Sequence, residues 1–186
     1  MSSVKRATIC SFCIALCCVL PLAFHALGVG SAFSPMHLPV LLCGLLCGWP
    51  YGLFCGIAGP VLSCLLSGMP SPVQLVWFIP ELAVYGLLSG LLYARIRTGN
   101  RFADLYLALV PAMLAGRVVG GVAQMLFYLS AARPWTVGMW AAAYLAGTLP
   151  GAVAQLVLLP ALGTALEKAQ LVPPRYPEKE GTDRHA

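Results

Sequence analysis

The chain has 186 residues, of which 60% are hydrophobic and only 9% are charged, whereas soluble domains carry about 25% charged residues. Since a membrane-spanning helix takes roughly 20 residues, this length allows at most about six or seven spans and leaves no room for a sizeable soluble domain. The formal net charge of +5 does not indicate nucleic-acid binding, because the basic residues cluster at helix ends and no basic face alternates with exposed aromatics. Composition therefore predicts one compact helical bundle in a lipid bilayer.

Apolar runs, divided by Gly, Pro and charged residues, predict six membrane helices. Their ranges are 7–27, 39–48, 51–66, 73–96, 103–129 and 137–166. The first run is longer than the roughly 7 to 15 apolar residues of a signal-peptide core, which favours a retained span over a cleaved leader. Trp49-Pro50 separates the second and third helices, and each is short for a full crossing, so we expect a tight helical hairpin there. The predicted fold class is an all-α membrane protein, a compact bundle of six transmembrane helices.

The basic residues predict the orientation of the bundle. With the N-terminus inside and six crossings, every Lys and Arg outside the membrane spans except Arg133 falls on the cytoplasmic side, so both termini are expected to be cytoplasmic. The connections 28–38, 67–72 and 130–136 then face outward. Residues 1–171 form the predicted transmembrane domain, and the Pro-rich, charged segment 172–186 is a predicted disordered cytoplasmic tail.

All eight cysteines lie in apolar helical stretches of the first third of the chain. Free cysteine behaves as a small hydrophobic residue, which favours a packing role. A redox or metal pair at Cys10-x-x-Cys13 is the alternative, but no His, Asp or Glu stands at ligand spacing, so no metal site is predicted.

Small residues recur at intervals of four, the spacing that lets membrane helices approach closely. Within the bundle this predicts packing between helices. Ala7, Ser11 and Ala15 form such a stripe on the first helix, which can face away from the bundle, and they are the predicted interface with an external partner. The glycine repeats are Gly44, Gly48, Gly52 and Gly56; Gly86 and Gly90; Gly116 and Gly120; Gly147 and Gly151.

Arg117 is the only basic residue in the apolar tract from Phe102 to Ser130, and it stands near the middle of that tract. A guanidinium at mid-bilayer costs roughly 2.5 to 3.5 kcal/mol, so a carboxylate, a polar cavity or an anionic ligand should compensate it. Two interpretations stay open: a structural ion pair with Glu81, or a bidentate contact with a ligand carboxylate.

The other polar and aromatic residues of the membrane segments fall on two stripes. Gln124 is seven residues after Arg117, with Tyr128 close to that line, and Trp77, Glu81 and Tyr85 form a stripe on the preceding helix. If the two faces meet, they bound a ligand cavity in the outer half of the bundle. The predicted substrate-binding residues are Arg117, Gln124, Tyr128, Trp77, Glu81, Tyr85, Gln155 and His37.

The segment from Gly28 to Leu38 is the longest outward connection, and its role is open between a flexible lid and a plain connector. No nucleotide-binding loop, His-Glu-x-x-His or Gly-x-Ser-x-Gly motif is present, so we predict no catalytic residues, no cofactor and no ATP hydrolysis by this chain. Two other functions remain alternatives: a small intramembrane enzyme using Glu81 as base and His37 as acid, and a non-transporting packing subunit.

Several segments, in their order along the chain, resemble the substrate-binding S-component of energy-coupling factor (ECF) vitamin transporters. The likeness extends from the first helix to about Leu166. The segments are Ser34-Pro35-Met36-His37-Leu38-Pro39-Val40-Leu41-Leu42-Cys43-Gly44, Gly48-Trp49-Pro50-Tyr51-Gly52, Gly68-Met69-Pro70, Glu81-Leu82-Ala83-Val84-Tyr85-Gly86-Leu87-Leu88-Ser89-Gly90-Leu91-Leu92-Tyr93 and Ala115-Gly116-Arg117.

The resemblance implies a multi-pass protein of the bacterial plasma membrane that captures a vitamin from outside, beneath the outward loops. It also implies docking on one membrane scaffold subunit and two cytoplasmic ATPases, with ATP-driven toppling to release the substrate inside. The family's Ala-x-x-x-Ala stripe on helix one is matched by Ala7 and Ala15 only through Ser11. Among the family's vitamins, a single central Arg favours a small carboxylate such as pantothenate, whereas a neutral ligand would use Gln124, Gln155 and the aromatics.

Overall fold

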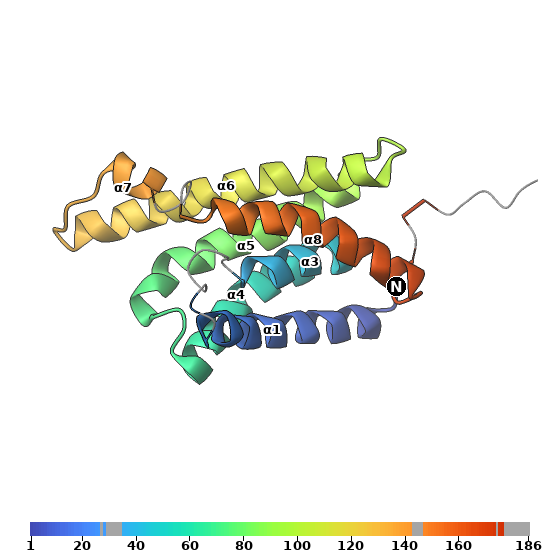
Figure 1. Ribbon diagram of the computed structural model, residues 1–186, viewed down its shortest axis with the longest axis horizontal. Coiled ribbons are helices and arrows are strands. Elements are labelled where there is room, and N and C mark those ends of the chain that lie inside the picture. The colour runs from blue at the N-terminus through green and yellow to red at the C-terminus, as the bar shows by residue number, and fades with distance from the viewer. Residues whose placement is uncertain (27, 29–34, 143–146, 174, 177–186) are drawn as a thin grey trace, which may run out of the picture.

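The computed structural model describes the chain except for residues 27, 29–34, 143–146, 174 and 177–186. Within these described residues the regular structure is helical, as predicted (Figure 1). The helices are α1 (Ser3–Ala26), α3 (His37–Cys47), α4 (Trp49–Ser67), α5 (Pro72–Arg95), α6 (Arg101–Ser130), α7 (Val137–Ala141) and α8 (Leu149–Lys168).

Five of these helices, α1, α4, α5, α6 and α8, are long and apolar enough to cross a membrane. The shorter α3 has 11 residues and rises about 16 Å, half of a hydrocarbon core. It lies in the middle of the bundle against α1, α4 and α5, and most of its residues are buried (Figure 1). Burial inside the protein explains why so short a helix can be so apolar.

The predicted break at Trp49-Pro50 is confirmed. Helix α3 ends at Cys47, and Gly48 adopts φ 91°, a conformation that glycine tolerates without a Cβ clash. Pro50 occupies the first turn of α4, where a missing backbone N–H costs nothing. The chain therefore turns between two packed helices within one residue.

The prediction of one continuous last helix over 137–166 is wrong. Helix α7 ends at Ala141, and α8 begins only at Leu149, after a turn at Gly147 and Thr148. Pro150 stands in the first turn of α8, a position that favours starting a helix rather than continuing one. The sequence between the two helices is mostly apolar and contains no charged residue, so hydropathy gave no sign of the break.

Glycine repeats bring α3, α4 and α5 into backbone contact. A Cβ on Gly52 or Gly86 would collide with the main chain of the other residue, and a Cβ on Gly44 would collide with Gly86 and the Ser89 side chain. These positions have no room for a larger side chain. The predicted role of the repeats in packing within the bundle is confirmed at this interface.

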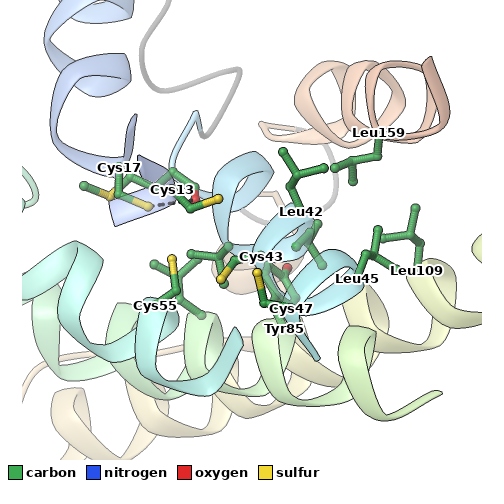
Figure 2. Close-up of a cluster of buried hydrophobic side chains, with 14 of the residues drawn as sticks. Cys13, Cys17, Leu42, Cys43, Leu45, Cys47, Cys55, Tyr85, Leu109 and Leu159 are labelled. Carbon is green, nitrogen blue, oxygen red and sulfur yellow. Dashed lines mark hydrogen bonds between the residues drawn. The ribbon is translucent and has the colours of Figure 1, made fainter. Parts of the chain in front are cut away.

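The core around α3 is rich in cysteine. Figure 2 shows Cys13 and Cys17 of α1, Cys43 and Cys47 of α3 and Cys55 of α4 gathered where the three helices meet. The thiols bond to main-chain carbonyls: those of Cys43 and Cys10 donate to the Tyr51 oxygen at 3.5 and 3.7 Å. The predicted packing role of these residues agrees with their burial.

The two ends of the bundle differ in composition. The first residues of α1, the end of α5, the end of α8 and the segment around Arg175 share one end (Figure 1). Part of the predicted tail is in contact there, because Val172 is buried and Arg175 and Tyr176 bond to Asp104. Residues 177–186 lie outside the described part of the chain.

Candidate functional site

The largest polar feature in the middle of the bundle is centred on Glu81 of α5, whose residue is only 2% exposed. Its Oε1 atom accepts a hydrogen bond from the Tyr85 hydroxyl at 3.1 Å and lies 3.3 Å from His37 Nε2. The rings of His37 and Tyr85 also contact each other, with centroids 5.0 Å apart. Three predicted site residues from α3 and α5 therefore form one buried network.

Helix α6 closes over this network through its glycines. Gly116 lies against the Tyr85 ring, and a Cβ on Gly120 would stand 2.7 Å from Glu81 Oε2. Larger residues at these positions would push α6 away from α5. The sequence therefore places α6 flat against the carboxylate.

The predicted ion pair between Glu81 and Arg117 is not what the structure shows for these two residues. Among the described residues, Glu81 pairs with His37. Arg117 donates from Nη1 to the hydroxyl of Thr148, just before α8, and is partly buried. The two opposite charges of the membrane segments thus have different environments.

The predicted meeting of the α5 and α6 stripes is found for the aromatic residues. Trp77 is buried, and its ring lies 5.7 Å from Phe127 and 6.2 Å from Tyr128, centroid to centroid. Trp77, Gln124 and Tyr128 do not line the 410 Å³ pocket at the end of the bundle or the 170 Å³ pocket beside Arg117. These aromatic side chains contact one another as a packed wall.

A pocket of about 410 Å³ lies beside the network, at the end of the bundle away from the described termini. This volume is within the range of roughly 300 to 1,000 Å³ that is typical of small-molecule sites. The pocket is formed by the end of α1, the start of α3, the turn between α4 and α5 and the first turns of α5. Its lining residues are Pro21, His25, Pro35, Met36, His37, Gly68, Met69, Pro70, Ser71, Gln74 and Phe78.

Of the predicted site residues, only His37 lines this pocket. Residues 29–34 of the predicted lid lie outside the described part of the chain, while Pro35 and Met36 line the pocket. Sequence reasoning missed the contribution of the α4–α5 turn. A usable signal was present, because the connections 28–38 and 67–72 were both predicted to face outward and therefore to lie at the same end.

Arg117 lines a different pocket, of about 170 Å³, between α6 and α8. The other lining residues are Val110, Met113, Leu114, Leu149, Ala152 and Leu156, all of them apolar. Gln155 of α8 is buried, with 3% of its surface exposed. The predicted site residues are therefore distributed over two regions rather than gathered around one cavity.

The predicted partner stripe on α1 lies on the protein surface. Ala7, Ser11 and Ala15 are all exposed, and the Ser11 hydroxyl donates to the Ala7 carbonyl at 3.0 Å. Because that hydroxyl is bonded within its own helix, the stripe presents a smooth, nearly apolar surface. Such a surface permits close approach of another membrane helix.

Residues 5–169 match the family described as "ECF transporter, substrate-specific component". No curated protein and no solved structure gives a significant match. The match covers all the helices described above except the first two residues of α1, and these helices are those of a multi-pass membrane protein. The chain belongs to the family of substrate-specific components of ECF transporters.

Proposed function

We propose that the protein captures a vitamin or related micronutrient in the 410 Å³ pocket and delivers it through an ECF transporter of the bacterial plasma membrane. The observation that carries this proposal is the position of the pocket. It is a cavity of ligand size beside a buried polar network, at the opposite end from the cluster of basic residues. With that basic end in the cytoplasm, as the positive-inside rule favours, the pocket opens outward.

The pocket has the chemistry of a small-molecule site. Its walls are mostly apolar, formed by proline, methionine and Phe78, and a few polar groups of His25, His37, Ser71 and Gln74 are available to fix the orientation of a ligand. On the side away from the pocket, His37 contacts the Glu81 carboxyl group through Nε2 and the Tyr85 ring through its own ring. A side chain oriented in this way needs less ordering when a ligand binds.

The direct test is to identify what the protein carries. Mass spectrometry of small molecules released from detergent-purified protein should show a vitamin-sized compound. Gln74→Trp, which fills the pocket from an exposed wall position, should reduce the amount recovered. Val76→Trp on the same helix is the matched control, because Val76 is 47% exposed and does not line the pocket. Equal recovery from both variants would contradict the location of the site.

Energy is proposed to come from partner subunits, one membrane scaffold and two ATPases. The exposed stripe of Ala7, Ser11 and Ala15 is the proposed docking surface. In Ala7→Leu/Ala15→Leu, co-purification of the scaffold and ATPases should be lost while vitamin binding in detergent persists. Ala23→Leu, at an exposed position of α1 that lies off the stripe, is the matched control. Retention of the partners in the double variant would exclude this surface.

A separate proposal keeps Arg117, Gln124, Tyr128 and Gln155 as the ligand contacts and pantothenate as the ligand, which would place the ligand outside the 410 Å³ pocket. Its test is Arg117→Lys, which keeps the charge but loses the bidentate fork. A loss of pantothenate affinity with intact expression would assign the role. Unchanged affinity would leave Arg117 as a structural residue bonded to Thr148.

One observation favours the enzyme alternative: Glu81 and His37 lie within 3.3 Å of each other, as an acid–base pair requires. Loss of turnover with retained binding in Glu81→Gln would support that alternative. If the protein is a non-transporting packing subunit, mass spectrometry of the purified protein should show no released vitamin-sized compound, which is the opposite of our expectation.

A further inference from the structure

The pocket of the proposed function is built from a stretch of chain that has no fixed charge. All of its lining residues fall between Pro21 and Phe78, and the sequence contains no Asp, Glu, Lys or Arg from Ala7 to Pro80. The only ionisable side chains on its wall are therefore His25 and His37.

A buried acidic side chain lies directly behind the pocket wall. Glu81 is 2% exposed and 3.3 Å from His37, which itself lines the pocket. The Tyr85 hydroxyl also bonds to this carboxyl group. The described contacts of the network therefore include no Lys or Arg that could receive an anionic ligand.

No described arginine lines the 410 Å³ pocket, and Arg133, in the connection between α6 and α7, is exposed to the surroundings. Arg117 lines the α6–α8 pocket, which shares no residue with the 410 Å³ pocket. Arg6, Arg97 and Arg175 line a hollow at the opposite end of the bundle. A carboxylate or phosphate that entered the 410 Å³ pocket would lose its hydration without gaining a contact with a Lys or Arg on the wall. Such desolvation of an anion costs free energy in a largely apolar site.

We propose that the substrate is a neutral or positively charged ring compound bearing amino, ring-nitrogen or hydroxyl groups, and not an anion. This inference rests on the proposed function and specifies its ligand class. The ring packs against Phe78 and the methionines, the side-chain polar groups of the wall orient it, and the Glu81 carboxylate favours positive charge on it. The proposal disagrees with pantothenate, which Arg117 alone had suggested.

The first experiment compares ligands of different charge. Binding of thiamine as a cation, riboflavin as a neutral ring compound, and pantothenate and folate as anions is measured by calorimetry at about pH 8, together with the identity of any released compound. A neutral or cationic compound should bind most tightly. An anion as the tightest ligand or as the released compound would overturn this inference and leave the proposed function intact. No binding and no released compound would count against both.

The second experiment changes the charge of the wall without disturbing the fold. Gln74 is exposed, and its side-chain oxygen accepts from the Ser71 backbone N–H in a capping box. Gln74→Glu preserves that acceptor. It should tighten binding of a cationic ligand by roughly three- to tenfold, and Gln74→Lys should weaken it by a similar factor. Equal affinities in the two variants, or the reverse order, would contradict the proposal.

Glu81→Gln tests the buried charge itself. It should weaken binding of a cation at least about tenfold and leave a neutral ligand within about twofold. Glu167→Gln is the matched control, because it removes a carboxylate at the opposite end of the bundle. If Glu81→Gln does not yield folded protein, the pair of Gln74 variants decides the question.

Discussion

The acidic side chains at the two ends of this bundle have different kinds of partner. At the pocket end, the buried charge of Glu81 is met by a histidine and a tyrosine within a stretch that is otherwise uncharged. At the opposite end, the acidic side chains form salt bridges with arginines: Asp104 with Arg175 at 2.7 Å, and Glu167 with Arg101 at 2.6 Å.

The two halves of the chain are therefore stabilised by different kinds of contact. The described part of the first half of the chain is held by close packing of glycine and cysteine at helix contacts, with Glu81 and His37 as its buried polar pair. The second half adds ion pairs near the basic end. A ligand site placed in the first half can therefore be shaped by packing alone, while the electrostatic contacts that fasten α5, α6, α8 and the tail remain remote from it.

The largest effect should come from breaking the packed half. Gly86→Leu would drive a side chain into the backbone of Gly52, which has nowhere to move. We expect little or no monodisperse protein by size-exclusion chromatography. Gly163→Leu on α8 is the control, because the nearest atom to a Cβ there is 4.0 Å away. A Gly86→Leu variant that elutes and melts like the parent would refute the packing argument.

A smaller effect should follow from Asp104→Ala in the charged half. The substitution removes the partner of the Arg175 guanidinium, the acceptor of the Tyr176 hydroxyl and that of the Thr98 amide. Leaving a partly buried guanidinium without its carboxylate is unfavourable. The melting temperature should fall by several degrees, and trypsin should cleave after Arg175 faster than in the parent. An unchanged cleavage rate would show that these bonds do not hold the tail.

The smallest effect should come from Glu167→Gln. The side chains of Arg101 and Glu167 are 28% and 15% exposed, so the pair is partly screened by solvent. We expect a loss of no more than about 1 kcal/mol in the free energy of unfolding. The difference from the parent should shrink in high salt. A loss larger than that of Asp104→Ala would reverse the ranking of the two ion pairs.

Much of the fold was predictable from local signals. The ends of α5 and α6 lie within two residues of the predicted ends, because Pro72, Arg95 and Arg101 mark the boundaries chemically. The α3–α4 break was predictable because proline has no N–H to donate. The interruption between α7 and α8 was not, since a turn made of small and apolar residues does not change the hydropathy.

The buried network of Glu81, His37 and Tyr85 was predictable in its members but not in its arrangement, and of the residues that line the pocket only His37 was predicted. Glu81 and His37 stood out as rare polar residues in apolar helices, yet 44 positions separate them, and no periodicity reports a contact between different helices. The sequence leaves Arg117 open between an ion pair with Glu81 and a contact with a ligand. The rotation of α6 instead points its guanidinium toward Thr148.

The sequence by itself determined that this is a helical membrane protein, where its main helices begin and end, and which few side chains are polar, because these properties depend on residues adjacent along the chain. Only the tertiary structure decided that α3 is enclosed, that Glu81 meets His37, and that two turns and two helix ends form a pocket apart from Arg117. Those outcomes depend on how closely helices approach and how they are rotated, and both are set by packing among residues distant in the chain.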